Sequence, residues 1–329
     1  MTTEQPLCDL YPVFTQSLSR LDLKPEQQLI ACLGGGADSQ TILDLLDRYR
    51  SEHPQYQYLA IHLDHEFHPA SGEWAQGLVA DCERRQFPLH TEVLEIPSGR
   101  RISKEAAGRE TRYARMAELG KPAAVFLLGQ HRNDQIETFL LQLKRGSGPK
   151  GLSGMAAVAK GLHQQRWVRP LLRVSKHEIY RYARHHELFW IEDETNFDTS
   201  IDRNFLRHEV VPQLERRWPQ FGEAVLRSAS LCAEQQQLLD ELLSVQIRPL
   251  IDAEGQLQSK TLEQASPQLQ RAALRFWLSQ RGASMPSYAQ LEQLRTQMLL
   301  TTNDANPSVN WGGYTVTRRR DRTLILSAL

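Results

Sequence analysis

Short apolar runs alternate with helical patterns through the first half of the sequence, and this alternation constrains the fold more than any other feature. The runs expected to form strands lie at residues 27–34, 56–65, 88–96 and 123–130. The patterns expected to form helices lie at residues 37–50, 71–86, 103–120 and 133–145. Strands joined by helices of this length indicate an α/β fold with a parallel, doubly wound sheet and right-handed crossovers.

The pattern changes beyond Arg145, and a chain of 329 residues is too long for one ordinary core. After a glycine-rich stretch come a short strand and a basic amphipathic helix. Further helices are expected at residues 220–247, 262–282 and 287–299, followed by a β-hairpin that turns at Arg320–Asp321.

We therefore expect two domains. The α/β domain should cover residues 1–215, with a helical extension at residues 1–24, and a smaller, mainly helical domain that ends in the hairpin should cover residues 216–329. No apolar run approaches the roughly 20 residues that span a bilayer. The four cysteines include no C-x-x-C pair, which fits a cytoplasmic protein.

The sequence LGGGADSQ, residues 33–40, ends the first expected strand and opens the first helix. A glycine loop in that place offers free backbone N–H groups and the positive end of a helix dipole, which bind phosphate without a lysine. The hydroxyl of Ser39 can reach a phosphate oxygen. Asp38 would repel a bare phosphate, so it indicates an intervening Mg²⁺. Alternatively, Asp38 only complements the helix dipole in a tight turn.

A second polar group follows the fourth expected strand, in GQHRNDQIET, residues 129–138. Because both loops come at the carboxyl ends of parallel strands, we expect them at one rim of the sheet. Asp134 and Glu137 share a helix face, where they either complement the dipole or hold Mg²⁺ or a cationic substrate. His131 is either a phosphate donor or a structural histidine.

Basic residues are concentrated in one part of a chain whose net charge is zero. Between Lys144 and Arg184 there are ten Lys and Arg residues and one acid, Glu178. Phosphate contacts respond to the local field rather than to the total charge. This stretch is therefore either a track for nucleic acid or a solvated face.

Several segments together resemble one protein family. The likeness rests on seven segments in the same order: GGGADS, HLDHEFH, EAAGRETRYARM, GQHRNDQIETFLLQLKRGSGPKGLSGM, RPLL, IEDETN and DRNFLRHEVVPQL. This order is similar to that of the tRNA(Ile)-lysidine synthases, PP-loop ATPases with an adenine nucleotide α-hydrolase-like fold. The resemblance covers about residues 25–215, and the helical region to about residue 300 looks similar to the family's small second domain. The chain resembles a short form without the last C-terminal domain of longer members.

The resemblance implies a two-step reaction on cytidine 34 in the CAU anticodon of an isoleucine tRNA, with ATP and Mg²⁺. ATP adenylates the C2 oxygen and releases pyrophosphate. The ε-amine of free L-lysine then displaces AMP and leaves lysidine, which changes decoding from AUG to AUA. The implied partners are this tRNA and lysine, and no membrane is involved. The resemblance leaves open whether the protein is a monomer or a homodimer.

The resemblance also implies roles for individual residues. The catalytic residues would be Asp38, Asp134, Glu137 and Arg207. Asp38 and Asp134 would hold Mg²⁺, and Asp134 and Glu137 would face the metal or the lysine. The nucleotide would contact Gly34, Gly35, Gly36, Ala37, Asp38, Ser39, Ile61, His62, Leu63, Arg112 and His131, with the strand edge at residues 61–63 placing the adenine. The tRNA would contact Lys144, Arg145, Lys150, Arg169, Arg173 and Arg203.

Three positions differ from the commonest pattern of the family. Gly34 stands where the loop usually begins with serine, Asn133 where many members have aspartate, and Gln130 where many have histidine. Two alternatives stay open. One is another adenylating PP-loop synthetase. The other, motivated by Gly34 and the short C-terminal region, is a catalytically weakened tRNA-binding paralogue.

We predict that Gly34 weakens ATP binding or slows adenylation without affecting the fold, because glycine keeps the backbone N–H and lacks the serine hydroxyl. Gly34→Ser should therefore increase ATP turnover. The measurement is AMP release by the wild-type protein and the variant, and an unchanged rate would contradict the prediction.

Overall fold

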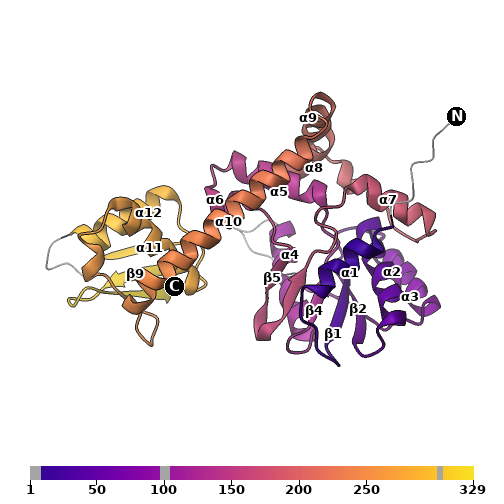
Figure 1. Cartoon of the computed structure of the whole chain (residues 1–329), viewed down its shortest axis with the longest axis horizontal. Helices are drawn as coiled ribbons and strands as arrows, with labels where there is room; N and C mark the ends of the chain where they lie inside the picture. Colours follow the sequence, from indigo (N-terminus) through magenta and orange to yellow (C-terminus); the bar gives the residue numbers. More distant parts are fainter. Residues whose placement is uncertain (1–8, 97–103, 302–306) are drawn as a thin grey trace. The chain divides into compact units, whose positions relative to one another are not determined.

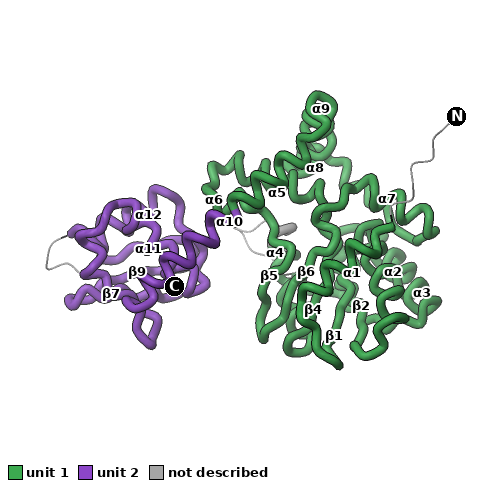
Figure 2. The backbone as a smooth tube through the Cα atoms, viewed as in Figure 1, with its two compact units in different colours: residues 1–232 green, residues 233–329 purple. Residues whose placement is uncertain are grey.

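The computed structural model describes residues 9–96, 104–301 and 307–329. It contains two compact units, Met1–Cys232 and Ala233–Leu329 (Figure 2). The division falls inside one long helix, α10 (Phe221–Ile247), whereas the sequence suggested a domain boundary after residue 215. That boundary stays a prediction. Within the described ranges, no helix is both long enough and apolar enough to cross a membrane.

The first unit is built on a six-stranded sheet (Figure 1). Its strands, in spatial order, are β3 (Leu89–Val93), β2 (Gln57–Asp64), β1 (Gln28–Leu33), β4 (Val125–Leu127), β6 (Arg166–Val168) and β5 (Val158–Lys160). All neighbouring pairs are parallel except β5 and β6. The predicted parallel α/β sheet is confirmed, and the antiparallel edge strand β5 is an addition that the sequence did not reveal.

Helices cover both faces of this sheet because successive side chains of a strand point to opposite sides. Leu29, Ala31 and Leu33 of β1 join one core, whereas Ile30 joins the other. The first core is closed by α1 (Tyr11–Ser19), α2 (Ala37–Glu52), α3 (Ser71–Arg84) and α7 (Lys176–His185). The second is closed by α4 (Lys104–Leu119).

The remaining elements of the first unit lie beyond the sheet. The helix α5 (Arg132–Lys144) follows β4, and the short α6 (Pro149–Leu152) and η1 (Leu162–Gln164) flank β5 in the chain. After α7 come η2 (Glu194–Phe197), α8 (Asp202–Phe205), the π-helical turn η3 (Leu206–Val210) and α9 (Val211–Arg217). Ile136, Val211 and Val225 form a small core that joins α5, α9 and the start of α10.

The second unit combines helices with a four-stranded antiparallel sheet. The sheet contains, in spatial order, β7 (Leu257–Gln258), β10 (Thr323–Ala328), β9 (Tyr314–Arg318) and β8 (Ser308–Trp311). The helical elements are η4 (Arg248–Leu250), η5 (Lys260–Leu262), α11 (Pro267–Gln280), α12 (Tyr288–Arg295) and η6 (Thr296–Leu300). The predicted hairpin is present as β9 and β10, and it belongs to a larger sheet that the sequence did not reveal.

The strand order places the switch point of the sheet between β1 and β4. The chain leaves β1 for β2 and β3 on one side and returns to β4 on the other side of β1. In open α/β sheets, ligands bind beyond the carboxyl ends of the strands at this point. A Cβ atom added to Gly129, after β4, would lie only 2.9 Å from the carbonyl carbon of Asp38, after β1. The prediction that the two loops share one rim is confirmed.

This close approach makes Gly129 sensitive to substitution. We expect Gly129→Ala to lower the free energy of unfolding by about 1–3 kcal/mol, because the added methyl group meets backbone atoms and overpacking has this typical cost. Gly34→Ala is the matched control, since a Cβ atom at Gly34 meets no atom within 4 Å. Thermal unfolding should show a clearly lower Tm only for Gly129→Ala. Equal Tm values for the two variants would contradict this account of the contact.

Candidate active site

The glycine loop after β1 is shaped by two of its residues. Gly35 has a φ angle of +87°, which disfavours any other residue, and a Cβ atom there would lie 2.8 Å from Cδ1 of Ile191. The backbone N–H of Ile191 donates to the carbonyl oxygen of Gly35 over 3.0 Å. The loop is thus fixed against the segment that follows α7. Gly34 has open space around it, so a serine side chain fits there.

Ser39 holds the glycine loop together from the first turn of α2. Its hydroxyl donates to the carbonyl oxygen of Gly36 over 2.9 Å and accepts from the N–H of Gly34 over 3.2 Å. Ser39 also lines a cavity at the sheet edge. A contact between this hydroxyl and a phosphate stays a prediction.

The first of two cavities, which we name the β-edge cavity, has a volume of about 350 Å³. The glycine loop forms one wall, and Ile61 and Leu63 of β2 belong to an apolar wall. His62 does not line it, since its side chain points the other way and its Nδ1 lies 3.1 Å from the carbonyl oxygen of Leu33. Only the backbone of His62 is therefore available for the predicted adenine contact. Burial lowers the pKa of the His62 imidazole, which favours its neutral form.

Arg112 gives the β-edge cavity a cation without a counter-ion. Its guanidinium lies against Nε2 of His65, and its Nε atom is buried without a partner. Among the described residues it forms no ion pair with a carboxylate, and burial lowers its pKa from the ordinary value. A buried cation of this kind is expected to bind an anionic ligand. The cavity therefore suits a phosphorylated molecule.

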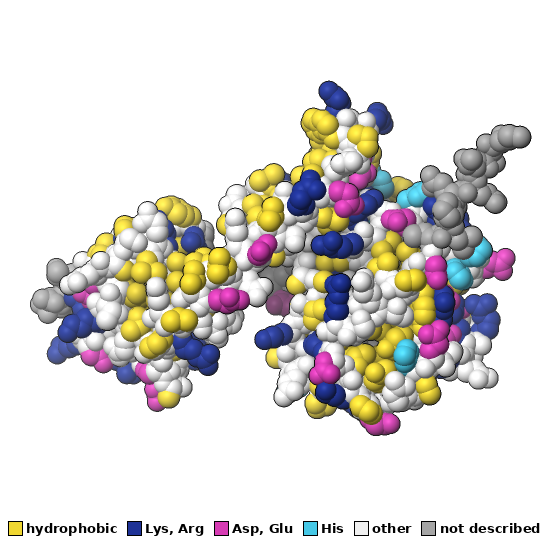
Figure 3. Space-filling model, in the orientation of Figure 1, with side chains coloured by type: hydrophobic (Ala, Val, Ile, Leu, Met, Phe, Trp, Pro, Cys, Tyr) yellow, Lys and Arg dark blue, Asp and Glu magenta, His cyan; other side chains and the backbone are white. Residues whose placement is uncertain are grey.

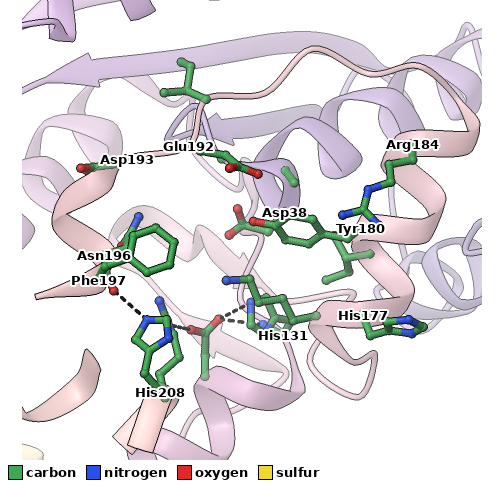
Figure 4. Close-up of a pocket in the computed structure, with 17 residues that line it drawn as sticks. Asp38, His131, His177, Tyr180, Arg184, Glu192, Asp193, Asn196, Phe197 and His208 are labelled. Carbon is green, nitrogen blue, oxygen red and sulfur yellow. Dashed lines mark hydrogen bonds and ion pairs between the residues drawn. The ribbon is translucent and has the colours of Figure 1, made fainter. Parts of the chain in front are cut away.

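The second cavity, which we name the α7 cavity, has a volume of about 570 Å³ (Figure 4). Asp38, His131 and Asp134 line it at the ends of β1 and β4. Lys176, His177, Tyr180 and Arg184 line it from α7, and Glu192, Asp193, Asn196, Phe197, Arg207 and His208 line it from the later segment. Figure 4 shows Asp38 and Tyr180 near the centre of the view and Phe197 and Asn196 at its left.

Asp38 stands where the two cavities meet, because it lines both of them together with Gly36, Ile191, Asp193 and Asn196. Burial raises the pKa of the Asp38 carboxyl, nearby His131 lowers it, and nearby Asp134 raises it further. A cation between the two carboxylates would relieve their repulsion. The predicted Mg²⁺ ligands Asp38 and Asp134 are thus brought together.

The protein alone does not complete a metal site. Within the described part of the chain, no group of three or more His, Cys, Asp or Glu side chains is arranged to hold a metal ion. Mg²⁺ usually binds one or two carboxylates together with substrate phosphates. Asp38 and Asp134 fit this mode, in which the metal arrives with a nucleotide.

Glu137 was predicted to face the metal or the lysine, but its side chain lies outside both cavities. Its carboxylate is almost fully buried and lines neither cavity. Both of its oxygens accept from Arg207, with Oε1 2.7 Å from Nε and Oε2 2.9 Å from Nη2. Nη2 of Arg207 also lies 3.2 Å from Oδ1 of Asp134. Glu137 therefore orients Arg207 toward the cavity instead of facing the metal or the lysine itself.

A π-helical turn directs Arg207 and its neighbour His208 into the site. Pro212 has no N–H group, so the carbonyl oxygen of His208 cannot receive the usual i−4 hydrogen bond. Instead the N–H of Val211 donates to the carbonyl oxygen of Leu206, five residues earlier. Such turns occur often at functional sites. The position of the proline in the sequence was the available signal for this feature.

The residues predicted to contact tRNA differ in exposure and in their partners. Arg169 is buried and donates from Nη1 to the carbonyl oxygen of Ala156 over 2.9 Å, so its predicted contact with tRNA is wrong for this arrangement. Lys144 pairs with Asp202 over 2.6 Å, and Arg203 lies 3.4 Å from Oε2 of Glu137.

The other three predicted contacts, Arg145, Lys150 and Arg173, are exposed. On the visible face of each unit, Lys and Arg side chains form several small groups (Figure 3).

Sequence reasoning missed the wall of the α7 cavity that comes from α7 and from residues 191–197. Lys176, Tyr180 and Arg184 lie about one turn apart and so share a face of α7. Asn196 and Phe197 lie in η2. The spacing of the α7 residues was a usable signal, whereas the polar segment 191–197 has no periodicity that could have assigned its side chains to a cavity.

The raised pKa of Asp38 predicts how a substitution changes stability with pH. A carboxyl whose pKa is raised on folding contributes stability that is present below its unfolded pKa and is lost as the pH rises through its folded pKa. Asp38→Asn replaces the carboxyl with a group that does not ionise, so the variant does not lose this stability as the pH rises. We expect the Tm of the ligand-free variant near pH 7 to exceed that of the wild type by about 2–4 °C, the shift that ~1 kcal/mol gives in a domain of this size.

The difference in Tm should shrink as the pH is lowered toward the ordinary aspartate pKa of about 3.9, because the folded carboxyl, whose pKa is raised, is protonated before that pH is reached. Thermal unfolding of both proteins at several pH values provides the measurement. A variant that is less stable than the wild type at neutral pH would contradict the assigned cause of the shift.

Comparison with known proteins agrees with this geometry. A family model described as "PP-loop domain" matches residues 10–214, and one described as "TilS substrate binding domain" matches residues 257–324. The chain is 57% identical over 307 residues to the tRNA(Ile)-lysidine synthase of Idiomarina loihiensis, a match that covers 93% of this chain and 68% of that protein. It is 41% identical over 312 residues to the enzyme of the same name from Vibrio cholerae, with 94% and 69% covered.

A solved structure shows the same type of fold. The U34-tRNA thiolase NcsA from Methanococcus maripaludis, solved with its [4Fe-4S] cluster, is similar with a TM-score of 0.58 and 16% sequence identity. The match covers 68% of this chain and 78% of that chain. Because the identity is low, this likeness supports the fold alone. The family matches, by contrast, extend along most of the sequence, and the chain belongs to the tRNA(Ile)-lysidine synthase family of PP-loop proteins.

Proposed function

We propose that this protein ligates free L-lysine to C2 of cytidine 34 in the CAU anticodon of tRNA(Ile), using ATP. The observation that carries the proposal is the meeting of two cavities at Asp38. For a nucleotide, one cavity has the glycine loop and an arginine that forms no ion pair with any described carboxylate, and the other has room for a base and an amine. A reaction that joins three substrates needs such adjoining spaces.

In the first step, ATP would occupy the β-edge cavity. The adenine would lie toward Ile61 and Leu63, and the phosphates toward the loop N–H groups and Arg112. The cytidine base would enter from the α7 cavity as an unpaired nucleotide, which is the usual target of proteins that read RNA sequence. The C2 oxygen would then attack the α-phosphorus atom, and pyrophosphate would leave.

Asp38 and Asp134 are the residues that would hold Mg²⁺, which would supply neutralisation of the negative charge on the phosphate oxygens. The chain's own residues would position the reacting groups. Arg207, oriented by Glu137, lies close enough to Asp134 to contact a phosphate oxygen near that carboxylate. Glu137 thus acts as a positioning residue.

In the second step, the ε-amine of lysine would attack C2, the C–N bond would form, and the bond between C2 and the AMP oxygen would break. A free lysine amine has an ordinary pKa of about 10.4, so it must lose a proton before the attack. Asp38, whose pKa is raised by burial, and Asp134 are carboxylates that line the α7 cavity at the ends of β1 and β4. A raised pKa makes a carboxylate a better base.

The tRNA would lie along exposed cations of the first unit and along the second unit, whose residues 257–324 match the substrate-binding domain. Arg145, Lys150 and Arg173 are the exposed cations among those predicted from the sequence. A cytoplasmic location follows from the proposed substrate. The proposal applies equally to a monomer and to a homodimer.

The test is the incorporation of radiolabelled lysine into a tRNA(Ile) transcript with a CAU anticodon. We expect incorporation that requires ATP, with one AMP released for each lysine incorporated. A methionine tRNA transcript, which shares the anticodon, should remain unlabelled. Asp38→Ala and Asp134→Ala should each lower the rate by about 100-fold or more, the usual effect of losing an acid–base group.

The alternatives predict other results. Another adenylating synthetase would release AMP without need for the tRNA. A silent tRNA-binding paralogue would bind the transcript and show no ATP–pyrophosphate exchange in its presence. Either result would contradict the proposed reaction.

A further inference from the structure

Trp74 has an unusual position for a tryptophan. It lies near the start of α3 and lines the β-edge cavity. None of the four hydrophobic clusters of the described residues contains it. A tryptophan normally contributes its large area to a core or an interface. Its placement at a cavity wall therefore points to a ligand.

The indole of Trp74 is held in place from behind. The imidazole of His68 stacks on it with ring centroids 4.3 Å apart and an interplanar angle of 19°. Nδ1 of His68 accepts a hydrogen bond from the N–H of Ala70 over 3.1 Å, which fixes the imidazole in turn. His68 does not line the cavity, whereas Trp74 does. The pair thus presents the indole, and not the imidazole, to the cavity.

The lining of the β-edge cavity combines two kinds of group. Trp74 lines it together with the apolar side chains Ile61, Leu63 and Met116. The glycine loop and the guanidinium groups of Arg109 and Arg112 also line the cavity. A flat aromatic ring suits the first group, and phosphates suit the second. A nucleotide is the ligand class that combines both.

We propose that Trp74 stacks on the adenine ring of ATP, with His68 as its positioning residue. This inference rests on the proposed use of ATP and adds a recognition residue to the backbone contacts of β2. Stacking between an aromatic side chain and a base contributes about 1–3 kcal/mol, which corresponds to a change in Kd of roughly 5- to 150-fold. The competing explanation is local, because the contact between His68 and Trp74 could serve only to fix the start of α3.

The experiment separates the base from the phosphates. Binding of a non-hydrolysable ATP analogue and of inorganic tripolyphosphate, both with Mg²⁺, is measured by calorimetry on the full chain. For Trp74→Ala we expect the Kd of the ATP analogue to rise about tenfold or more, with that of tripolyphosphate unchanged. Trp74→Phe should keep most of the affinity, because it keeps a ring. His68→Ala should show a smaller loss, again only for the ATP analogue.

Two further variants serve as controls. Trp218→Ala removes a tryptophan that is 54% exposed and lines neither cavity, so its affinity for both ligands should equal that of the wild type. Trp74→Leu keeps apolar volume without a ring. It should lose affinity for the ATP analogue alone, even where Trp74→Ala proves too unstable to measure.

Each other outcome overturns the inference. Equal losses for the ATP analogue and tripolyphosphate would assign Trp74 the local role at the start of α3. An unchanged Kd for the ATP analogue in both Trp74→Ala and Trp74→Leu would exclude stacking. If the wild type itself failed to bind the ATP analogue, the proposed function would fail as well, which distinguishes that result from the failure of the Trp74 assignment.

Discussion

The contact between the loops after β1 and β4 is the constraint on which the rest of the site depends. Gly129 lets the second loop approach the backbone of Asp38 to a distance that a side chain would prevent. This approach brings Asp134 and His131 close enough to change the pKa of the Asp38 carboxyl. Asp38 is also one of the residues shared by the two cavities. The Asp38 carboxylate is therefore within reach of molecules bound in either cavity.

Charges around the junction are compensated unevenly. On the α7 side, Arg207 is paired with Glu137 and Asp134, so its position is fixed before any substrate binds. On the β-edge side, Arg112 has no carboxylate partner among the described residues. A paired cation is oriented, and an unpaired buried cation favours an incoming anion. This difference agrees with a nucleotide in the β-edge cavity and with a positioning role for the ion pairs on the other side.

Much of this arrangement could be predicted from the sequence. Strand and helix order, the parallel sheet and the meeting of the two loops follow from hydrophobic periodicity and from the rule for carboxyl ends of strands. The place of Glu137 does not follow, because a spacing of three residues shows that two side chains share a face without showing what that face contacts. Arg169 was misplaced since charge alone does not reveal burial. β5 was missed because this edge strand is largely exposed and has no run of large apolar residues.

Asn133, which stands where many members of the family have aspartate, has a structural contact in this chain. Its Oδ1 atom accepts the backbone N–H of Lys176 over 3.0 Å, which joins the start of α5 to the start of α7. An aspartate would offer the same acceptor, so the exchange keeps the connection between the helices and removes only a charge. Lys176, Tyr180 and Arg184 lie on the helix that begins at this contact, and all three line the α7 cavity. This part of the cavity wall therefore depends on a hydrogen bond that asparagine and aspartate can both accept.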